Sequence, residues 1–86
     1  MERKEIFEKV KGIIENFVAP PRDYNIDGST KLKEDLCCDS LDGVEISLEL
    51  DKTFRINTND VDIETINNGT VDDIVDMVEK KINSKE

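Results

Sequence analysis

The sequence predicts an all-α fold, a small bundle of three main helices plus one short helix, with a long first loop. Apolar residues recur every three or four positions in three separate segments, which is the spacing of amphipathic helices. No segment alternates apolar and polar residues as a half-buried strand does. Helix-breaking and helix-capping residues separate the segments. We expect residues 1–86 to form one domain, because a chain of this length is too short for two.

The first helix is expected from Arg3 to Val18, before Pro20-Pro21, which cannot continue a helix. Its apolar positions are Ile6, Phe7, Val10, Ile13, Ile14, Phe17 and Val18. A loop from Ala19 to Asp39 follows, and loops of this length in small domains are usually functional. Leu32 and Leu36 are its main apolar residues, and we expect them to hold the loop against the core.

The second main helix is expected from Ser40 to Phe54, with Asp39 as its N-cap. At about 100° per residue, this helix has two apolar stripes on nearly opposite sides. One stripe is Ile46, Leu50 and Phe54, and the other is Leu41, Val44 and Leu48. A helix packed between neighbours would bury both stripes, whereas a helix with a binding surface would leave the second partly open. The pattern alone leaves both interpretations open.

A short helix and a final main helix are expected in the rest of the chain. The short helix is capped by Asn59 or Asp60 and ends at Asn67-Asn68-Gly69. The final helix has Thr70 as its cap, with Asp73 in a capping-box position. Its apolar face is Val71, Ile74, Val75, Val78 and Ile82, and we expect the chain to fray from Asn83 onward.

The charge balance restricts the possible functions. The chain has 12 Lys and Arg against 21 Asp and Glu, a net charge of −9, and no histidine. Nucleic acids and anionic membrane surfaces would repel it, so partners with basic patches are favoured. Without histidine the chain cannot build a Ser-His or Cys-His nucleophile pair, and no acid/base pair with a specific spacing is found. We therefore expect a protein that is not an enzyme.

The remaining composition favours a monomeric cytoplasmic protein. No apolar run approaches the roughly 20 residues that a membrane-spanning helix needs, so no membrane insertion is expected. Cys37 and Cys38 are adjacent, so they cannot join distant parts of the fold and are most simply reduced thiols. Two thiols also fall short of the four ligands of a structural zinc, and we expect no metal.

One loop motif points to another class of function. Asp23, Asn25, Asp27 and Glu34 have the spacing of the oxygen ligands in an EF-hand, which would make this a calcium-binding protein. Lys31 lies at a position that normally supplies an oxygen or a water. No second hand is present, so a coincidence in an acidic loop is the favoured interpretation.

The segment Asp39-Ser40-Leu41 is the most informative part of the sequence. A serine at the first position of a helix holds its hydroxyl at the positive end of the helix dipole. Free backbone N–H groups and the dipole would stabilise a phosphate ester at this point. Because serine is also common at helix starts for purely structural reasons, the position alone does not establish a modification.

The residues around Ser40 resemble those of the acyl carrier proteins. The likeness rests on Asp39-Ser40-Leu41, on Leu32-x-x-Asp35-Leu36 before it, and on Asp42, Val44, Glu45 and Phe54 after it. It extends to Thr70-Val71 and covers nearly the whole chain. The resemblance implies a 4′-phosphopantetheine on Ser40, between Asp39 and Leu41, transferred from coenzyme A by a phosphopantetheinyl transferase. The arm's thiol would hold acyl groups as thioesters.

The resemblance also implies that the helix from Ser40 to Phe54 is the recognition surface. Its acidic residues Asp42, Glu45, Glu49 and Asp51 would meet basic patches on acyl-transferring and chain-elongating enzymes, and Leu41 and Val44 would supply apolar contact. Fatty-acid synthesis is the implied pathway. Cys37-Cys38 replaces the small pair that is common before the serine, and Gly43 costs the helix up to about 1 kcal/mol. A carrier of a specialised polyketide or peptide-type pathway is therefore the alternative.

Overall fold

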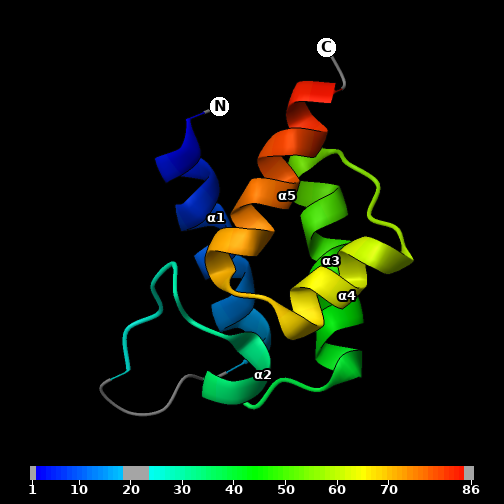
Figure 1. Ribbon diagram of the computed structural model, residues 1–86. Helices are drawn as coiled ribbons and strands as arrows, with labels where there is room; N and C mark the ends of the chain where they lie inside the picture. Colours follow the sequence, from blue (N-terminus) through cyan, green and yellow to red (C-terminus); the bar gives the residue numbers. More distant parts are fainter. Residues whose placement is uncertain (1, 19–23, 85–86) are drawn as a thin grey trace.

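The computed structural model describes residues 2–18 and 24–84, and within them it confirms the all-α prediction (Figure 1). Five helices follow one another along the chain: α1 Arg3–Phe17, α2 Leu32–Asp35, α3 Ser40–Phe54, α4 Asp60–Asn68 and α5 Val71–Ser84. Three of these, α1, α3 and α5, are the expected main helices, and α4 is the expected short one.

Three of the expected boundaries need correction. The four-residue α2 lies inside the segment that was expected to be a loop throughout. Helix α1 ends at Phe17, with Val18 as its C-cap, and the prolines expected to end it lie outside the described residues. Helix α5 continues through Asn83 to Ser84, so the expected fraying does not begin at Asn83.

The core lies between α1, α3 and α5, with α4 packed against α3 and α5 (Figure 1). Each helix contributes side chains at the predicted helical spacing because the same face turns inward every three or four residues. The buried apolar side chains on these four helices include Ile6, Val10, Ile14, Ile46, Leu50, Ile66, Val71, Ile74 and Val78. Helix α2 lies at the end of the bundle where α3 begins (Figure 1).

Three helices begin with a capping box whose third helical residue is an aspartate. Asp39 and Asp42 form the box of α3, Asn59 and Asp62 that of α4, and Thr70 and Asp73 that of α5. Each box satisfies two backbone N–H groups that the helix itself leaves unpaired, and the carboxylates favour the positive end of the dipole. The predicted caps of α3 and α5 are thus confirmed, and Asn59 is the cap of α4.

The first loop is fastened to the start of α5. The N–H of Val71 donates to the carbonyl of Thr30 at 2.9 Å, and the N–H of Asp72 donates to that of Gly28 at 2.9 Å. Lys31 and Thr70 form an isolated antiparallel bridge beside these bonds. We call this set of backbone bonds the loop strap. Leu32 and Leu36 are buried, as predicted, so the chain that precedes α3 has a fixed position.

Candidate functional site

Ser40 is the first residue of α3 and is exposed. The cap of the helix is the preceding residue: Asp39 Oδ1 accepts from the N–H of Asp42 at 2.9 Å, and Asp42 Oδ2 accepts from the N–H of Asp39 at 3.1 Å. Because Asp39 caps the helix, the fold does not depend on the Ser40 hydroxyl for that role. The hydroxyl is available for chemistry at an accessible helix N-terminus.

The two cysteines before Ser40 position the start of α3. Cys38 is buried, and its N–H donates to the carbonyl of Leu32 at 3.0 Å. Cys37 is exposed and has a φ of 56°, in the left-handed region that favours glycine. This conformation explains why a small residue such as glycine suits position 37. The chain turns sharply here between α2 and α3.

The environment of Cys38 suppresses its reactivity. Burial, together with the nearby carboxylates of Asp42 and Asp39, raises the pKa of its thiol to about 11. Both cysteines are free thiols, as predicted. The thiolate is the form that binds metals and attacks electrophiles, so Cys38 acts as a small apolar core residue at neutral pH.

The second apolar stripe of α3 is open to solvent. Leu41 is 64% exposed, Val44 39% and Leu48 60%, whereas Ile46 and Leu50 are fully buried. The neighbouring helices therefore do not bury this stripe, which stays open as the second of the two interpretations requires. Monomeric proteins rarely group large apolar side chains at the surface without a use for them.

The predicted acidic residues of α3 fall into two groups. Glu45 is exposed, and Asp42 and Glu49 are half-buried, so this part of the helix presents carboxylates beside the apolar stripe. Asp51 differs, because its Oδ1 accepts from the N–H of Thr58 at 2.9 Å and its Oδ2 accepts from the Thr58 hydroxyl at 3.3 Å. The structure therefore gives Asp51 a role in holding the connection between α3 and α4.

A pocket of about 220 Å³ lies beside Ser40. It is lined by Lys33, Cys38, Asp39, Ser40, Asn67 and Asn68. Nothing in the sequence indicated a role for Lys33, and Asn67 and Asn68, which were expected to break the chain, both belong to α4. Their proximity to Ser40 arises from the packing of α4 against α3, which no local pattern specifies.

Gly43 is the residue that permits this close packing. It is buried, and a Cβ at this position would overlap the Oδ1 atom of Asn67. Among the described residues, that Oδ1 atom is buried without a hydrogen-bond partner. The glycine, which was expected only to weaken the helix, forms a notch for the Asn67 side chain. A glycine inside a helix is the one sequence signal that indicates such a close approach.

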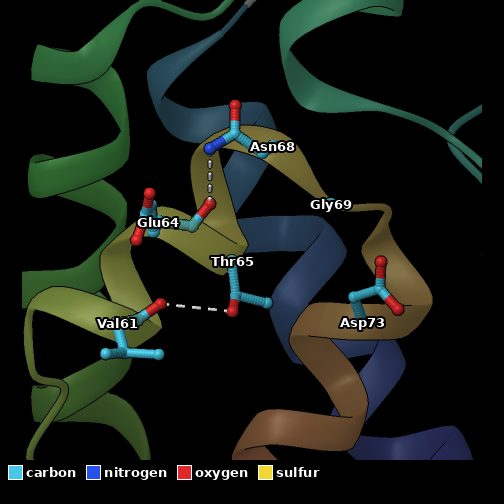
Figure 2. A pocket seen from close by; sticks show the side chains of 6 residues that line it. All are labelled: Val61, Glu64, Thr65, Asn68, Gly69 and Asp73. Atoms are coloured by element: carbon cyan, nitrogen blue, oxygen red, sulfur yellow. Dashed lines mark hydrogen bonds between the residues drawn. The ribbon is translucent and has the colours of Figure 1, made fainter.

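A larger hollow of about 520 Å³ lies between α4 and the start of α5 (Figure 2). The Thr65 hydroxyl donates to the carbonyl of Val61 at 3.2 Å, and Asn68 Nδ2 donates to that of Glu64 at 3.2 Å. Figure 2 shows that both of these polar groups bond back to their own helix. The hollow is open and does not include Ser40, so the smaller pocket is the better candidate site.

The structure does not assemble the EF-hand ligands from the residues it describes. Asp27 Oδ1 accepts hydrogen bonds from the N–H and hydroxyl of Ser29, which lower the pKa of Asp27, and Glu34 pairs with Lys31 at 3.5 Å. No cluster of three Asp, Glu, Cys or His side chains that could hold a metal ion occurs in residues 2–18 and 24–84. Asp23 lies outside these ranges.

Comparison with known proteins gives the family. An acyl carrier protein of Thermotoga maritima is 39% identical over 93% of this chain and 95% of its own length. Acyl carrier proteins of the Onion yellows phytoplasma and of Chlorobium phaeovibrioides are 40% and 38% identical, over 87% and 94% of this chain and 95% and 100% of their own lengths. No family model matches the sequence.

No helix in the described part of the chain is long and apolar enough to cross a membrane. The relatives match over nearly their whole lengths, the helical bundle is the predicted one, and the serine of Asp39-Ser40-Leu41 stands exposed at the start of α3. The chain belongs to the acyl carrier protein family.

Proposed function

We propose that Ser40 carries 4′-phosphopantetheine and that residues 1–86 act as one carrier domain rather than as an enzyme. The observation that carries this proposal is the exposed serine at the first position of α3, with its capping role taken by Asp39. When bound, the group supplies a terminal thiol that can hold acyl groups as thioesters. Asp39 keeps the serine at the helix N-terminus, and Leu41 follows it on the exposed face.

The residues beside Ser40 fit such a group. The pocket of about 220 Å³ adjoins the serine, and its lining includes a lysine and two amide side chains, which suit a phosphodiester and an amide-containing chain. The orphaned Oδ1 atom of Asn67 is an additional hydrogen-bond acceptor in this region.

Loading with coenzyme A and a phosphopantetheinyl transferase tests the attachment. The mass of the wild-type protein should increase by one arm, and that of Ser40→Ala should not change. Ser29→Ala is the matched control, because Ser29 is an exposed serine in the first loop and should leave loading intact. Since Asp39 is the cap, Ser40→Ala should keep the wild-type melting temperature. Modification that survives in Ser40→Ala would remove the basis of the proposal.

We further propose that partner enzymes recognise α3 through two kinds of contact. Asp42, Glu45 and Glu49 attract basic patches, and Leu41 and Val44 supply burial beside Ser40. Exposed charges at the rim of an interface mainly change the association rate and its salt dependence. Truncation of a buried valine removes apolar area and costs on the order of 1–2 kcal/mol regardless of salt.

Charge reversal separates these two contributions. Glu45→Lys should slow loading by the transferase most at low salt, with a difference that shrinks as salt is added. Val44→Ala should weaken loading with little salt dependence. Glu8→Lys and Glu15→Lys on α1 change the net charge equally and are the controls. An equal loss from the α1 variants would show that net charge, rather than α3, governs recognition.

We assign the carrier to acyl-transferring and chain-elongating enzymes of fatty-acid synthesis or a related pathway, acting as a monomer in the cytoplasm. The support is the family itself, the net charge of −9 and the two free thiols. A mass spectrum of the protein isolated from its natural host identifies the attached acyl group. A fatty acyl chain would support the first pathway, and a polyketide or aminoacyl group would support a specialised one.

A further inference from the structure

The pocket beside Ser40 brings together residues from three parts of the chain. Lys33 belongs to α2, Ser40 begins α3, and Asn67 lies near the end of α4. Helix α4 packs against both α2 and α3, which brings these residues together around one space. A group attached to the Ser40 hydroxyl would start at the edge of this space.

The charges around the pocket are unfavourable for a phosphate unless a cation takes part. Asp39 lines the pocket, and the Asp42 carboxylate bonds to the Asp39 N–H. Lys33 is the cationic side chain in the lining. The lysine ion pairs found among the described residues involve Lys31 and Lys81, so within this part of the chain Lys33 forms no ion pair with a carboxylate.

Asn67 supplies the second kind of contact. Its Oδ1 atom faces the notch at Gly43 and, within the described part of the chain, has no hydrogen-bond donor. A carbonyl buried in this way gains by turning toward a donor, and the turn breaks no hydrogen bond of Oδ1. The arm has a hydroxyl and an amide N–H in the few bonds after its phosphate, and both are donors.

We propose that this pocket binds the proximal part of the arm, with Lys33 paired to the phosphodiester and the Asn67 amide bonded to the hydroxyl and first amide beyond it. The inference rests on the proposed attachment at Ser40. Both residues are positioning residues that hold the arm in this pocket. Neither takes part in the transfer of an acyl group.

The test uses protein loaded with ¹⁵N-labelled phosphopantetheine. The heteronuclear NOE of the first arm amide reports whether that amide is held. It should be high in the wild type and fall to the value of free pantetheine in Asn67→Ala and in Asn67→Leu, which keeps the size but lacks the amide. Asn83→Ala, which changes an exposed asparagine of α5, should keep the wild-type value.

A second measurement addresses Lys33. The side-chain ε-CH₂ signals of Lys33 should shift between the unloaded and loaded proteins, whereas those of Lys9, an exposed lysine of α1, should not. Lys33→Gln should lower the NOE of the arm amide, and Lys9→Gln should leave it unchanged. The melting temperature of each variant shows that it is folded before the arm is examined.

The outcomes distinguish this inference from the proposed function. An arm amide as mobile in the wild type as in Asn67→Ala, in proteins whose mass shows one arm on Ser40, overturns the pocket while leaving the attachment in place. A mass that does not increase on treatment with coenzyme A and transferase overturns the attachment, and the pocket with it. A high NOE of the arm amide in the wild type that falls in the Asn67 and Lys33 variants, and not in the controls, supports binding of the arm in this pocket.

Discussion

The contact between Asn67 and Gly43 leads to an unusual expectation, which is that removal of a side chain with a buried polar atom stabilises the protein. The Asn67 Oδ1 atom is buried without a partner among the described residues, and a buried unsatisfied acceptor costs about 1–3 kcal/mol. Asn67 lies in the last turn of α4, so the preference of a helix interior for alanine, roughly 0.5 kcal/mol, applies there only in part. The atoms removed leave a small gap at the notch, which offsets part of the gain.

Asn67→Ala should therefore raise the free energy of unfolding by about 1 kcal/mol. For a domain of this size that corresponds to an increase of about 4–8 °C in melting temperature. Urea and thermal unfolding of the unloaded protein, followed by circular dichroism, measure the change. Asn68→Ala is the matched control, because the Asn68 amide donates to the carbonyl of Glu64 and no buried acceptor is released.

Gly43→Ala tests the same contact from the other helix. A Cβ at residue 43 forces the Asn67 amide out of the notch, which releases the same buried carbonyl, and alanine adds up to about 1 kcal/mol of helix propensity. Both single variants remove the same buried Asn67 carbonyl from the notch. The stability gained by the double variant should therefore be smaller than the sum of the gains of the two single variants. A destabilised Asn67→Ala, or equal effects of Asn67→Ala and Asn68→Ala, would refute the reasoning.

Four further expectations follow from other features. Cys37→Gly should raise the urea midpoint slightly, by about 0.5 kcal/mol of stability, because glycine relieves the left-handed backbone at φ 56°, whereas Cys37→Ala should not. Burial raises the pKa of the Cys38 thiol to about 11, so the folded state keeps a proton that the unfolded state loses near pH 9. The free energy of unfolding should therefore fall between pH 9 and 11, and it should fall less in Cys38→Ala. Lys81→Met should lower the melting temperature by the equivalent of about 1 kcal/mol, since Lys81 pairs at 2.7 Å with Asp62, in the first turn of α4, and donates to the carbonyl of Asn57, in the connection before that helix. Added salt should raise the melting temperature of the unloaded protein, because the net charge of −9 repels itself; a melting curve indifferent to salt would contradict this.

The elements that were predicted correctly are those that local sequence determines. Helix α3 begins at Ser40 because Asp39 and Asp42, three residues apart, cap each other's backbone. The burial of Ile46 and Leu50 follows from their helical spacing. Neither feature requires knowledge of the rest of the chain.

The features that were missed depend on contacts between distant residues. Helix α2 is only four residues long, too short to be stable alone, and it is held by the burial of Leu32 and by the bridge that joins Lys31 to Thr70. The meeting of Asn67 with Gly43 depends on how α4 lies against α3. The residues next to Asn67 in the sequence do not indicate that it contacts another helix. The pocket beside Ser40 could therefore not be predicted.

The loop strap has a consequence for the order in which the chain folds. It joins Gly28, Thr30 and Lys31 to the residues that begin α5, and α2, α3 and α4 all lie between its two ends. Helices α3 and α4 are neighbours along the chain, so the contacts between them close a short loop at a low cost in entropy. The loop strap and the packing of α1 against α5 close long loops, which costs more entropy. We expect the region around Ser40 to gain native contacts early in folding, and the two ends of the chain to close around it afterwards.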